Sequence, residues 1–176
     1  MWKRVGVAVL VVVVLFLVVG FLLPGEFTVE QSRVVKADAE KIHALVGDLR
    51  HWEEWMPWYE MDPTIVTTFG EKTTGVGAKQ TWTGKDGDGE ILITRSDPTS
   101  GIEYDMVMIE GGRRMPSQGG VRYAQEGDGI KVTWSMSGEI DTPVIGGYLA
   151  LAMDRFLIGP SFQEGLEKLG KLASGG

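Results

Sequence analysis

The stretch Val132-Thr133-Trp134-Ser135-Met136-Ser137-Gly138 (residues 132–138) alternates apolar and hydroxyl-bearing side chains. Successive side chains of a β-strand point to opposite faces of the sheet, so Val132, Trp134 and Met136 share one face. This alternation is typical of an antiparallel sheet that packs one face on a core and leaves the other in water. The stretch therefore predicts a half-buried strand whose inward side chains are unusually large.

The same two-residue period recurs upstream of this stretch. It runs through residues 65–69, 76–82, 90–95, 102–108 and 121–123. Glycine-rich turns at residues 86–89 and 127–129 are typical of hairpins between such segments. Together with a first strand at residues 26–36, the pattern predicts one curved antiparallel sheet of about seven strands.

Two helical segments are expected between the first strand and the rest of the sheet. Asp38 is a candidate N-cap for a helix over Ala39–Gly47. The stretch Asp48–Trp58 predicts a second, short helix, and Pro57 should end it because proline lacks an amide donor. Trp52 and Trp55 stand three residues apart in it and should share a face.

The C-terminal region predicts a long helix from about Pro143 to Ala173, with a break or kink at Gly159-Pro160. Its second half is amphipathic, whereas the first half, Ile145–Ile158, is apolar on most sides. The order is thus a strand, two helices, six strands and a long helix, an α+β arrangement. The long helix is the element large enough to cover one face of the sheet, and a gap remains between them unless side chains fill it.

The N-terminus carries a different signal. Val5–Leu23 has 19 residues, 17 of them apolar, which is long enough to cross a hydrocarbon core of about 30 Å as a helix. Lys3 and Arg4 precede it and favour an N-terminus in the cytoplasm. We expect residues 1–25 to anchor the chain in a membrane and residues 26–176 to form one domain on the non-cytoplasmic side. A cleaved signal peptide is the alternative, although its apolar stretch is usually shorter.

Composition narrows the possible functions. The chain has a formal net charge of −7, and residues 26–176 are more acidic still because Lys3 and Arg4 lie outside them. An acidic domain repels phosphate backbones, so nucleic acid is not an expected partner. The absence of cysteine rules out disulfides, thiolate metal sites and cysteine nucleophiles. No cofactor and no metal are expected.

Motifs for catalysis are weak. Gly75-Val76-Gly77 lacks the third glycine of a dinucleotide fingerprint, and two histidines, His43 and His51, are too few for a zinc site. Asp154 interrupts the apolar half of the long helix and could act as an acid facing a cavity, or pair with Arg155 or Arg95. Arg113-Arg114 lies in a glycine-rich region, 111–120, expected to be a loop that is either solvated or in contact with anionic lipid headgroups.

Four segments in order carry a family resemblance. They are the tryptophan-rich stretch 48–58, Gly75-Val76-Gly77-Ala78, the strand 132–138 and residues 162–169 near the C-terminus. The chain resembles the START-like, polyketide cyclase/dehydrase (SRPBCC) superfamily, and in particular its bacterial members with an N-terminal membrane anchor. The resemblance implies a helix-grip fold with a deep apolar cavity between sheet and helix. Members bind lipids, sterols, quinones, polyketides or hormones, and only some are enzymes.

Aromatic and methionine side chains are the candidate ligand contacts, because they suit adaptable apolar pockets. The alternation of strands 102–108 and 132–138 places Tyr104 beside Met106 and Trp134 beside Met136 on the face that meets the long helix. The predicted lining residues are Trp82, Tyr104, Met106, Trp134 and Met136, with Trp55 and Trp58 near the mouth.

We therefore expect a membrane-tethered domain that binds a small hydrophobic, lipid-like ligand. The alternatives are a cyclase, dehydratase or hydrolase acting on a hydrophobic substrate, and a protein-interaction domain with a filled core. An open cavity favours binding, a buried acid with a shifted pKa inside it favours an enzyme, and a packed interior favours the interaction domain.

Overall fold

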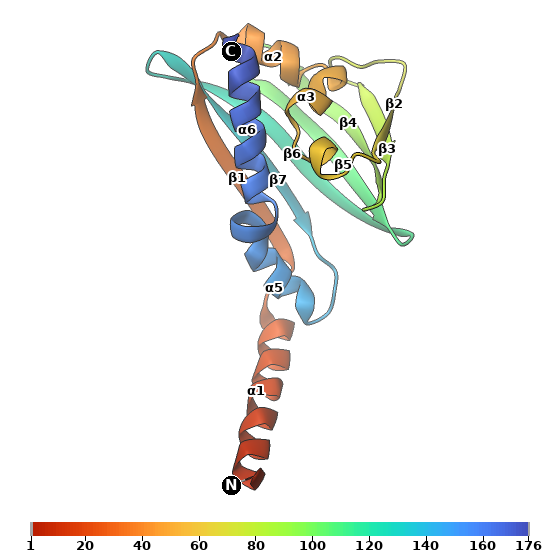
Figure 1. Ribbon diagram of the computed structural model, residues 1–176, viewed down its shortest axis with the longest axis vertical. Helices are drawn as coiled ribbons and strands as arrows, with labels where there is room; N and C mark the ends of the chain where they lie inside the picture. Colours follow the sequence, from red (N-terminus) through yellow and green to blue (C-terminus); the bar gives the residue numbers. More distant parts are fainter. Residues whose placement is uncertain (1, 176) are drawn as a thin grey trace.

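The computed structural model describes residues 2–175 as a curved sheet gripping a C-terminal helix, with one helix extending away from it (Figure 1). The elements in chain order are α1 (Trp2–Leu22), β1 (Glu26–Val35), α2 (Ala39–Val46), η1 (Leu49–His51), α3 (Trp52–Trp55), α4 (Trp58–Met61), β2 (Val66–Phe69), β3 (Lys79–Thr83), β4 (Asp88–Asp97), β5 (Gly101–Glu110), β6 (Arg113–Glu126), β7 (Gly129–Glu139), α5 (Ile145–Ala152), η2 (Met153–Leu157) and α6 (Gly159–Ser174). This arrangement is the helix-grip fold, as expected.

The sheet is antiparallel throughout and has seven strands in the order β1-β7-β6-β5-β4-β3-β2. The first strand thus closes on the last one, because β1 pairs with β7 along its whole length. Val132, Trp134 and Met136 are all buried, which confirms the alternation in residues 132–138. We call the face that carries them the inner face.

The helices α2, α3 and α6 lie on the inner face (Figure 1). α6 presents an apolar stripe toward β1 and β7, and the side chains of Phe162, Leu166 and Leu169 in it are buried. This spacing of three and four residues places them on one side of a helix, so their burial stabilises the grip of the sheet on α6. Ile42 and Val46 of α2 add to the same core.

The predicted break in the C-terminal helix is confirmed, and its form is now visible. α5 passes into η2, a π-helical turn in which the Ile158 amide donates to the Met153 carbonyl at 2.8 Å. α6 then begins at Gly159, with Pro160 in its first turn where a missing amide costs nothing. Gly159 is required there because a Cβ would lie 1.6 Å from the Asp154 carbonyl oxygen.

Two expectations about local structure were wrong. Pro57 lies just after the end of α3, but it is also the N-cap residue of a further helical turn, α4, which the sequence pattern did not predict. Residues 111–120 are not a loop: only Gly111 and Gly112 form the turn, both at positive φ, and Arg113 already begins the long strand β6. Pairing along β5 overrides the breaking tendency of the glycines and proline in this stretch.

α1 is a single 21-residue helix that stands apart from the sheet (Figure 1). By length and composition alone, residues Arg4–Leu22 are apolar enough to cross a membrane, and a signal sequence passes the same test. Almost all of its side chains are exposed, so it is not a core helix of the domain.

Candidate functional site: the inner face of the sheet

One end of the inner face is a packed aromatic cluster. The rings of Trp134 and Phe162 stack with centroids 3.9 Å apart, and Trp55 meets Trp134 edge-on at 5.0 Å. Trp52 completes the cluster against Trp55 and Tyr104. We call these five residues the packed end. Because Trp134 is only 1% exposed and in contact on both sides, side chains fill the space between sheet and helix here.

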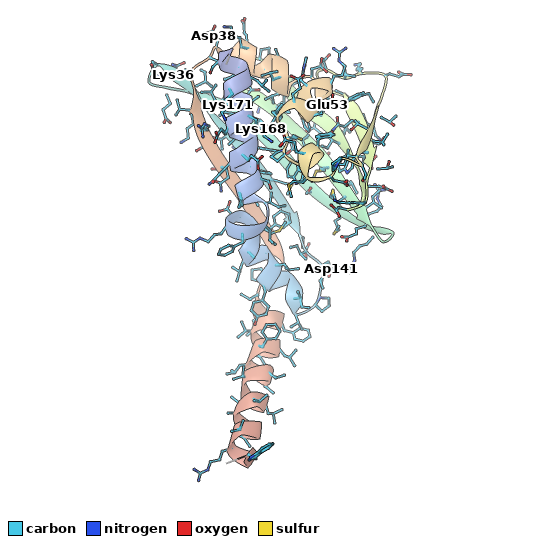
Figure 2. The ribbon with its side chains drawn as sticks, viewed as in Figure 1. Lys36, Asp38, Glu53, Asp141, Lys168 and Lys171 are labelled. Carbon is cyan, nitrogen blue, oxygen red and sulfur yellow. The ribbon has the colours of Figure 1, made fainter. Side chains whose placement is uncertain are left out.

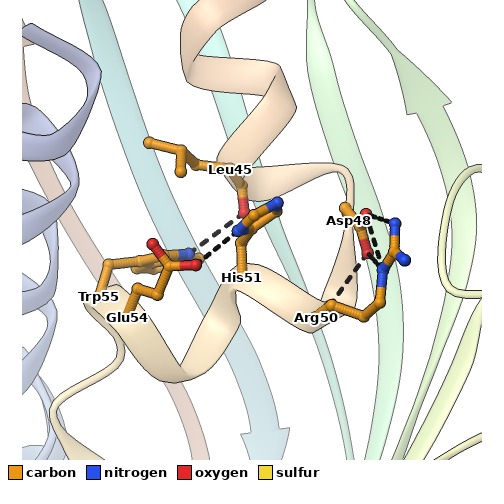
Figure 3. Close-up of polar contacts among 6 residues, drawn as sticks. All are labelled: Leu45, Asp48, Arg50, His51, Glu54 and Trp55. Atoms are coloured by element: carbon orange, nitrogen blue, oxygen red, sulfur yellow. Dashed lines mark hydrogen bonds and ion pairs between the residues drawn. The ribbon is translucent and has the colours of Figure 1, made fainter. Parts of the chain in front are cut away.

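Hydrogen bonds hold the indoles of the packed end in place. The Trp134 Nε1 group donates to the Tyr104 hydroxyl at 2.9 Å. The Trp55 Nε1 group donates to the Leu45 carbonyl at 3.3 Å (Figure 3). At the same corner Asp48 accepts from the Arg50 amide and forms an ion pair with its guanidinium at 2.6 Å (Figure 3). Buried polar groups that are paired in this way cost little to bury, so the packed end is a stable core.

Aromatic residues of the sheet lie opposite glycines. Tyr104 pairs in register with Gly119, and a Cβ on Gly119 would lie 2.4 Å from the tyrosine ring. Trp82 pairs in the same way with Gly89, where a Cβ would lie 2.2 Å from the indole. The rings therefore lie flat over the glycine backbone of the neighbouring strand and do not stand out from the sheet.

The other end of the inner face is more open. It carries Trp82, Met106, Met108, Met115 and Ser117, all of them half-buried. We call these five residues the open end. They lie toward the β5–β6 hairpin, which extends beyond the helices (Figure 1).

Two polar side-chain atoms at this end are buried without a hydrogen-bond partner. They are Oε1 of Gln80, which is 2% exposed, and Oγ of Ser117. Both side chains are on the inner face in one row across the sheet, because Gln80 pairs with Ile91, Ile91 with Met106, and Met106 with Ser117. A buried polar atom without a partner costs free energy, which a ligand that supplies a partner would recover.

The titratable groups of the inner face are mostly phenols. Burial raises the pKa of Tyr104 to about 12, and burial also raises the pKa of Tyr59 in α4, against hydrogen bonds from Thr67 and Gln80 that lower it. Both are neutral hydrogen-bonding groups at neutral pH. The pKa of the buried Asp62 is lowered, first by its hydrogen bond from Thr64, which accounts for this carboxylate structurally.

Two hollows lie away from the inner face. One of about 340 Å³ is on the outer face of the sheet and is lined mainly by polar side chains, among them Glu30, Glu103 and Arg122. A second, of about 420 Å³, lies between β1 and α6 beside Arg33 and Glu167. Within residues 2–175, no cluster of three or more acidic or histidine side chains could hold a metal ion.

Comparison with protein families adds the decisive observation. Residues 26–174 match the family model described as polyketide cyclase / dehydrase and lipid transport. The chain belongs to this polyketide cyclase/dehydrase and lipid-transport family. The match spans every strand and helix from β1 to the end of α6, and the family supports a ligand-binding domain.

Several solved structures share this fold. Protein CV1439 from Chromobacterium violaceum is 19% identical with a TM-score of 0.58, and the alignment covers 83% of this chain and 96% of that one. Hypothetical protein jhp0584 from Helicobacter pylori is 13% identical with a TM-score of 0.61, covering 83% and 87%. DynU16, from the dynemicin biosynthetic locus, is 14% identical with a TM-score of 0.54, covering 84% and 48%. Comparison with curated protein sequences finds no match.

The predicted contact residues divide between the two ends of this family fold. Trp55, Tyr104, Trp134 and Met136 are buried, and the first three belong to the packed end. Trp58, Trp82 and Met106 are half-buried at its margin or at the open end. Their role in binding stays a prediction.

Sequence reasoning missed Gln80, Ser117 and Met115 as candidate contacts. Gln80 carried a visible signal, because it is the polar residue in an alternating segment whose neighbours on the same face, Ala78 and Trp82, are apolar. Ser117 and Met115 gave no such signal, since their segment was expected to be a loop.

The remaining candidates have structural partners. Asp154 does not pair with Arg155 or Arg95: its Oδ1 accepts from Gln31 Nε2 at 2.9 Å and from the Glu30 amide at 3.3 Å. Arg95 pairs instead with Glu103 at 3.2 Å. His43 is half-buried in α2, where desolvation lowers its pKa and Ser96 Oγ lies 3.2 Å from its Nε2. Arg114 pairs with Glu90 at 2.7 Å, so it is not simply solvated.

Proposed function

We propose that the chain is a membrane-tethered binding domain for a small, lipid-like ligand held on the inner face at the open end. In this proposal residues 1–25 are the anchor, residues 26–176 are the binding domain, and the packed end is its structural support. The family supports ligand binding in general. The ligand class, the tether and the place of binding are inferred from the features below.

The observation that carries the proposal is that apolar side chains at the open end stay partly exposed while a polar atom among them is buried without a hydrogen-bond partner. Met106, Met108 and Met115 keep part of their surface in solvent, while the polar Gln80 Oε1 among them is buried and unpaired. Flexible methionines adapt to ligands of different shape. A ligand with an apolar body and one hydroxyl or amide donor fits this set, because the body covers the methionines and the donor pairs with Gln80.

The short connection to α1 supports the tether. α1 ends at Leu22 and β1 begins at Glu26, so only three residues separate the helix from the sheet. A connection this short keeps the inner face near the bilayer and raises its effective concentration for ligands dissolved there. A domain that collects ligands from a membrane gains most from such a position.

Binding can be tested with the full chain in lipid nanodiscs and two probes, a fluorescent fatty-acid analogue and a short-chain quinone. Met106→Trp should fill the open end and weaken binding by about tenfold or more, since overpacking typically costs about 1–3 kcal/mol. Leu92→Trp is the matched control, because Leu92 is on the outer face of β4. Equal affinities of both variants and the unmodified chain would reject this site.

The side of the membrane is tested separately. Fused after Gly176, a phosphatase that is active only after export should be active in a bacterial host. An inactive phosphatase, with an active cytoplasmic reporter at the same position, would reject the expected orientation.

A further inference from the structure

The chain segment that connects β7 to α6 exposes a run of large apolar side chains. α5 and η2 together carry Ile145, Leu149, Leu151, Phe156 and Leu157, all of them exposed. Leu151 and Phe156 are 67% and 71% exposed. A contiguous apolar surface of this kind usually marks a contact with a partner or a membrane.

This segment packs directly on α1. The ring of Tyr148 in α5 stacks on Phe16 of α1, with centroids 4.6 Å apart and the planes 2° from parallel. The Tyr148 hydroxyl donates to the Phe16 backbone carbonyl at 2.9 Å. A tyrosine whose hydroxyl donates to a backbone carbonyl has its hydrogen satisfied by protein, which suits a site where water is scarce.

Glycines allow α1 and α5 to approach closely. A Cβ on Gly20 would lie 2.5 Å from the Val144 carbonyl oxygen, and a Cβ on Gly147 would lie 2.3 Å from Leu23 Cβ. Small residues at such contacts are typical of helices that associate in membranes. Val144 itself has φ of 67°, a strained conformation for a β-branched residue, and it directs the chain into α5 against α1.

The length of α1 sets the depth of this contact. A hydrocarbon core of about 30 Å needs about 20 helical residues, and α1 has 21, so a spanning α1 is immersed over nearly its whole length. Phe16 lies six residues before the end at Leu22, which is roughly 9 Å along the axis at 1.5 Å per residue. Tyr148, beside Phe16, is therefore at a depth that lipid occupies.

The charges of the segment agree with this position. Asp154 turns toward the sheet, where Gln31 and the Glu30 amide bind it. Arg155 is exposed, and a long basic side chain can reach headgroups from the edge of the bilayer. Figure 2 shows mostly carbon side chains along α1 and α5, whereas labelled charged residues such as Lys168 and Lys171 are on α6, farther from α1.

We propose that Val144–Leu157 is a second membrane-embedded segment, docked on α1 through Gly20 and Gly147, whose exposed apolar side chains contact lipid acyl chains. This inference rests on the proposed tether. It adds that the domain itself dips into one leaflet, so that the bilayer and not water covers the α5 and η2 surface.

The absence of cysteine makes the test direct, because any introduced cysteine is the single thiol of the chain. Leu151→Cys and Phe156→Cys, each labelled with an environment-sensitive fluorophore, are reconstituted as full chain in phosphatidylcholine vesicles with or without brominated acyl chains. Val12→Cys in α1 reports insertion of the anchor, and Val66→Cys on β2 is the exposed apolar control.

Probes at Leu151 and Phe156 should lose emission to brominated lipid, as a probe at Val12 does, while the probe at Val66 keeps its emission. Quenching at Val12 without quenching at Leu151 and Phe156 would overturn the inference and leave the tether intact. Absence of quenching at Val12, Leu151 and Phe156 would overturn both. A probe at Leu151 that reports an apolar environment but is not quenched by brominated lipid would indicate that a second copy or another protein covers this surface. That result would also overturn the inference.

A matched pair of glycine variants tests the docking on α1. Gly20→Leu should wedge the two helices apart and reduce quenching at Leu151, whereas Gly6→Leu, with no atom within 4 Å of its Cβ position, should leave quenching unchanged. Equal quenching at Leu151 in both variants would overturn the docking through Gly20.

Discussion

The packed end and the open end lie on the same face of one sheet and share strand β5, but they behave differently. At the packed end Trp134 contacts Phe162 of α6 and Trp55 of α3, and its indole N–H donates to the Tyr104 hydroxyl. At the open end Met106 pairs with Ser117, whose hydroxyl is buried without a partner. The difference teaches that inward-facing aromatic and sulfur-containing residues become core only where a helix packs on them.

Trp134→Ala should produce the largest effect, because it removes a filled indole and leaves a cavity among its neighbours. We expect a loss of about 3–5 kcal/mol in the free energy of unfolding. Urea denaturation followed by circular dichroism measures it, since tryptophan fluorescence changes with the substitution itself. A loss below about 1 kcal/mol would mean that the packed end contains a void after all.

Alanine substitutions at two glycines of α6, Gly165 and Gly170, provide a second test of the packed end. A Cβ on Gly165 would lie 2.8 Å from Trp134 Cζ3, whereas one on Gly170 would meet only Val35 at 3.4 Å. Gly165→Ala should therefore destabilise the domain by about 1–3 kcal/mol. Gly170→Ala should stabilise it by roughly 0.5–1 kcal/mol through helix propensity. Thermal unfolding of the two variants compares them, and equal midpoints would contradict close packing of α6 on Trp134.

Met106→Ala should cost less stability than Trp134→Ala, because Met106 keeps part of its surface in solvent. We expect a loss of about 1 kcal/mol, roughly half the value of a fully buried methionine, together with altered uptake of the fatty-acid or quinone probe. Denaturation and probe titration are run on the same samples. Destabilisation as strong as in Trp134→Ala, with unchanged uptake, would show that the open end is core.

Gln80→Met should change binding more than stability. The substitution removes an unpaired buried oxygen and keeps a similar volume, but it also removes the hydrogen bond from Gln80 to Tyr59, so the free energy of unfolding should change by less than about 1 kcal/mol. Affinity for a hydroxyl-bearing ligand should fall, while affinity for its hydroxyl-free analogue should not. Parallel loss of both affinities would argue against a hydrogen bond from the ligand to Gln80.

The smallest effect concerns His43 in α2, which lies beside Ser96 and Tyr123. Desolvation lowers its pKa in the folded state, partly offset by the charge of Asp97, so the unfolded chain takes up the proton first as the pH falls. The contribution of His43 to the free energy of unfolding is present above about pH 6.5 and is lost as the pH decreases toward the lowered pKa. Urea midpoints at pH 7.5 and 5.5 should differ more in the unmodified chain than in His43→Gln. An equal difference in both would exclude His43 as the cause.

Much of the fold was predictable because it depends on local periodicity. The two-residue alternation in 132–138 and the stripe of α6 led to the correct sheet and helix, and Gly159-Pro160 marked the break. The turn α4 after Pro57 and the strand through Arg113–Gly120 were not predictable, because contacts with distant segments outweigh the local propensities there.

The sequence by itself determined that this chain has an apolar N-terminal helix, an antiparallel sheet and a long C-terminal helix, since chain-local patterns encode each of them. Only the tertiary structure decided which large side chains fill space and which leave it open. Strand register placed Gly119 beneath Tyr104 and Gly89 beneath Trp82, and Gly165 let α6 approach Trp134. The physical reason is that packing depends on the residue across the contact, which lies on another strand or helix and is not visible in the period of either segment.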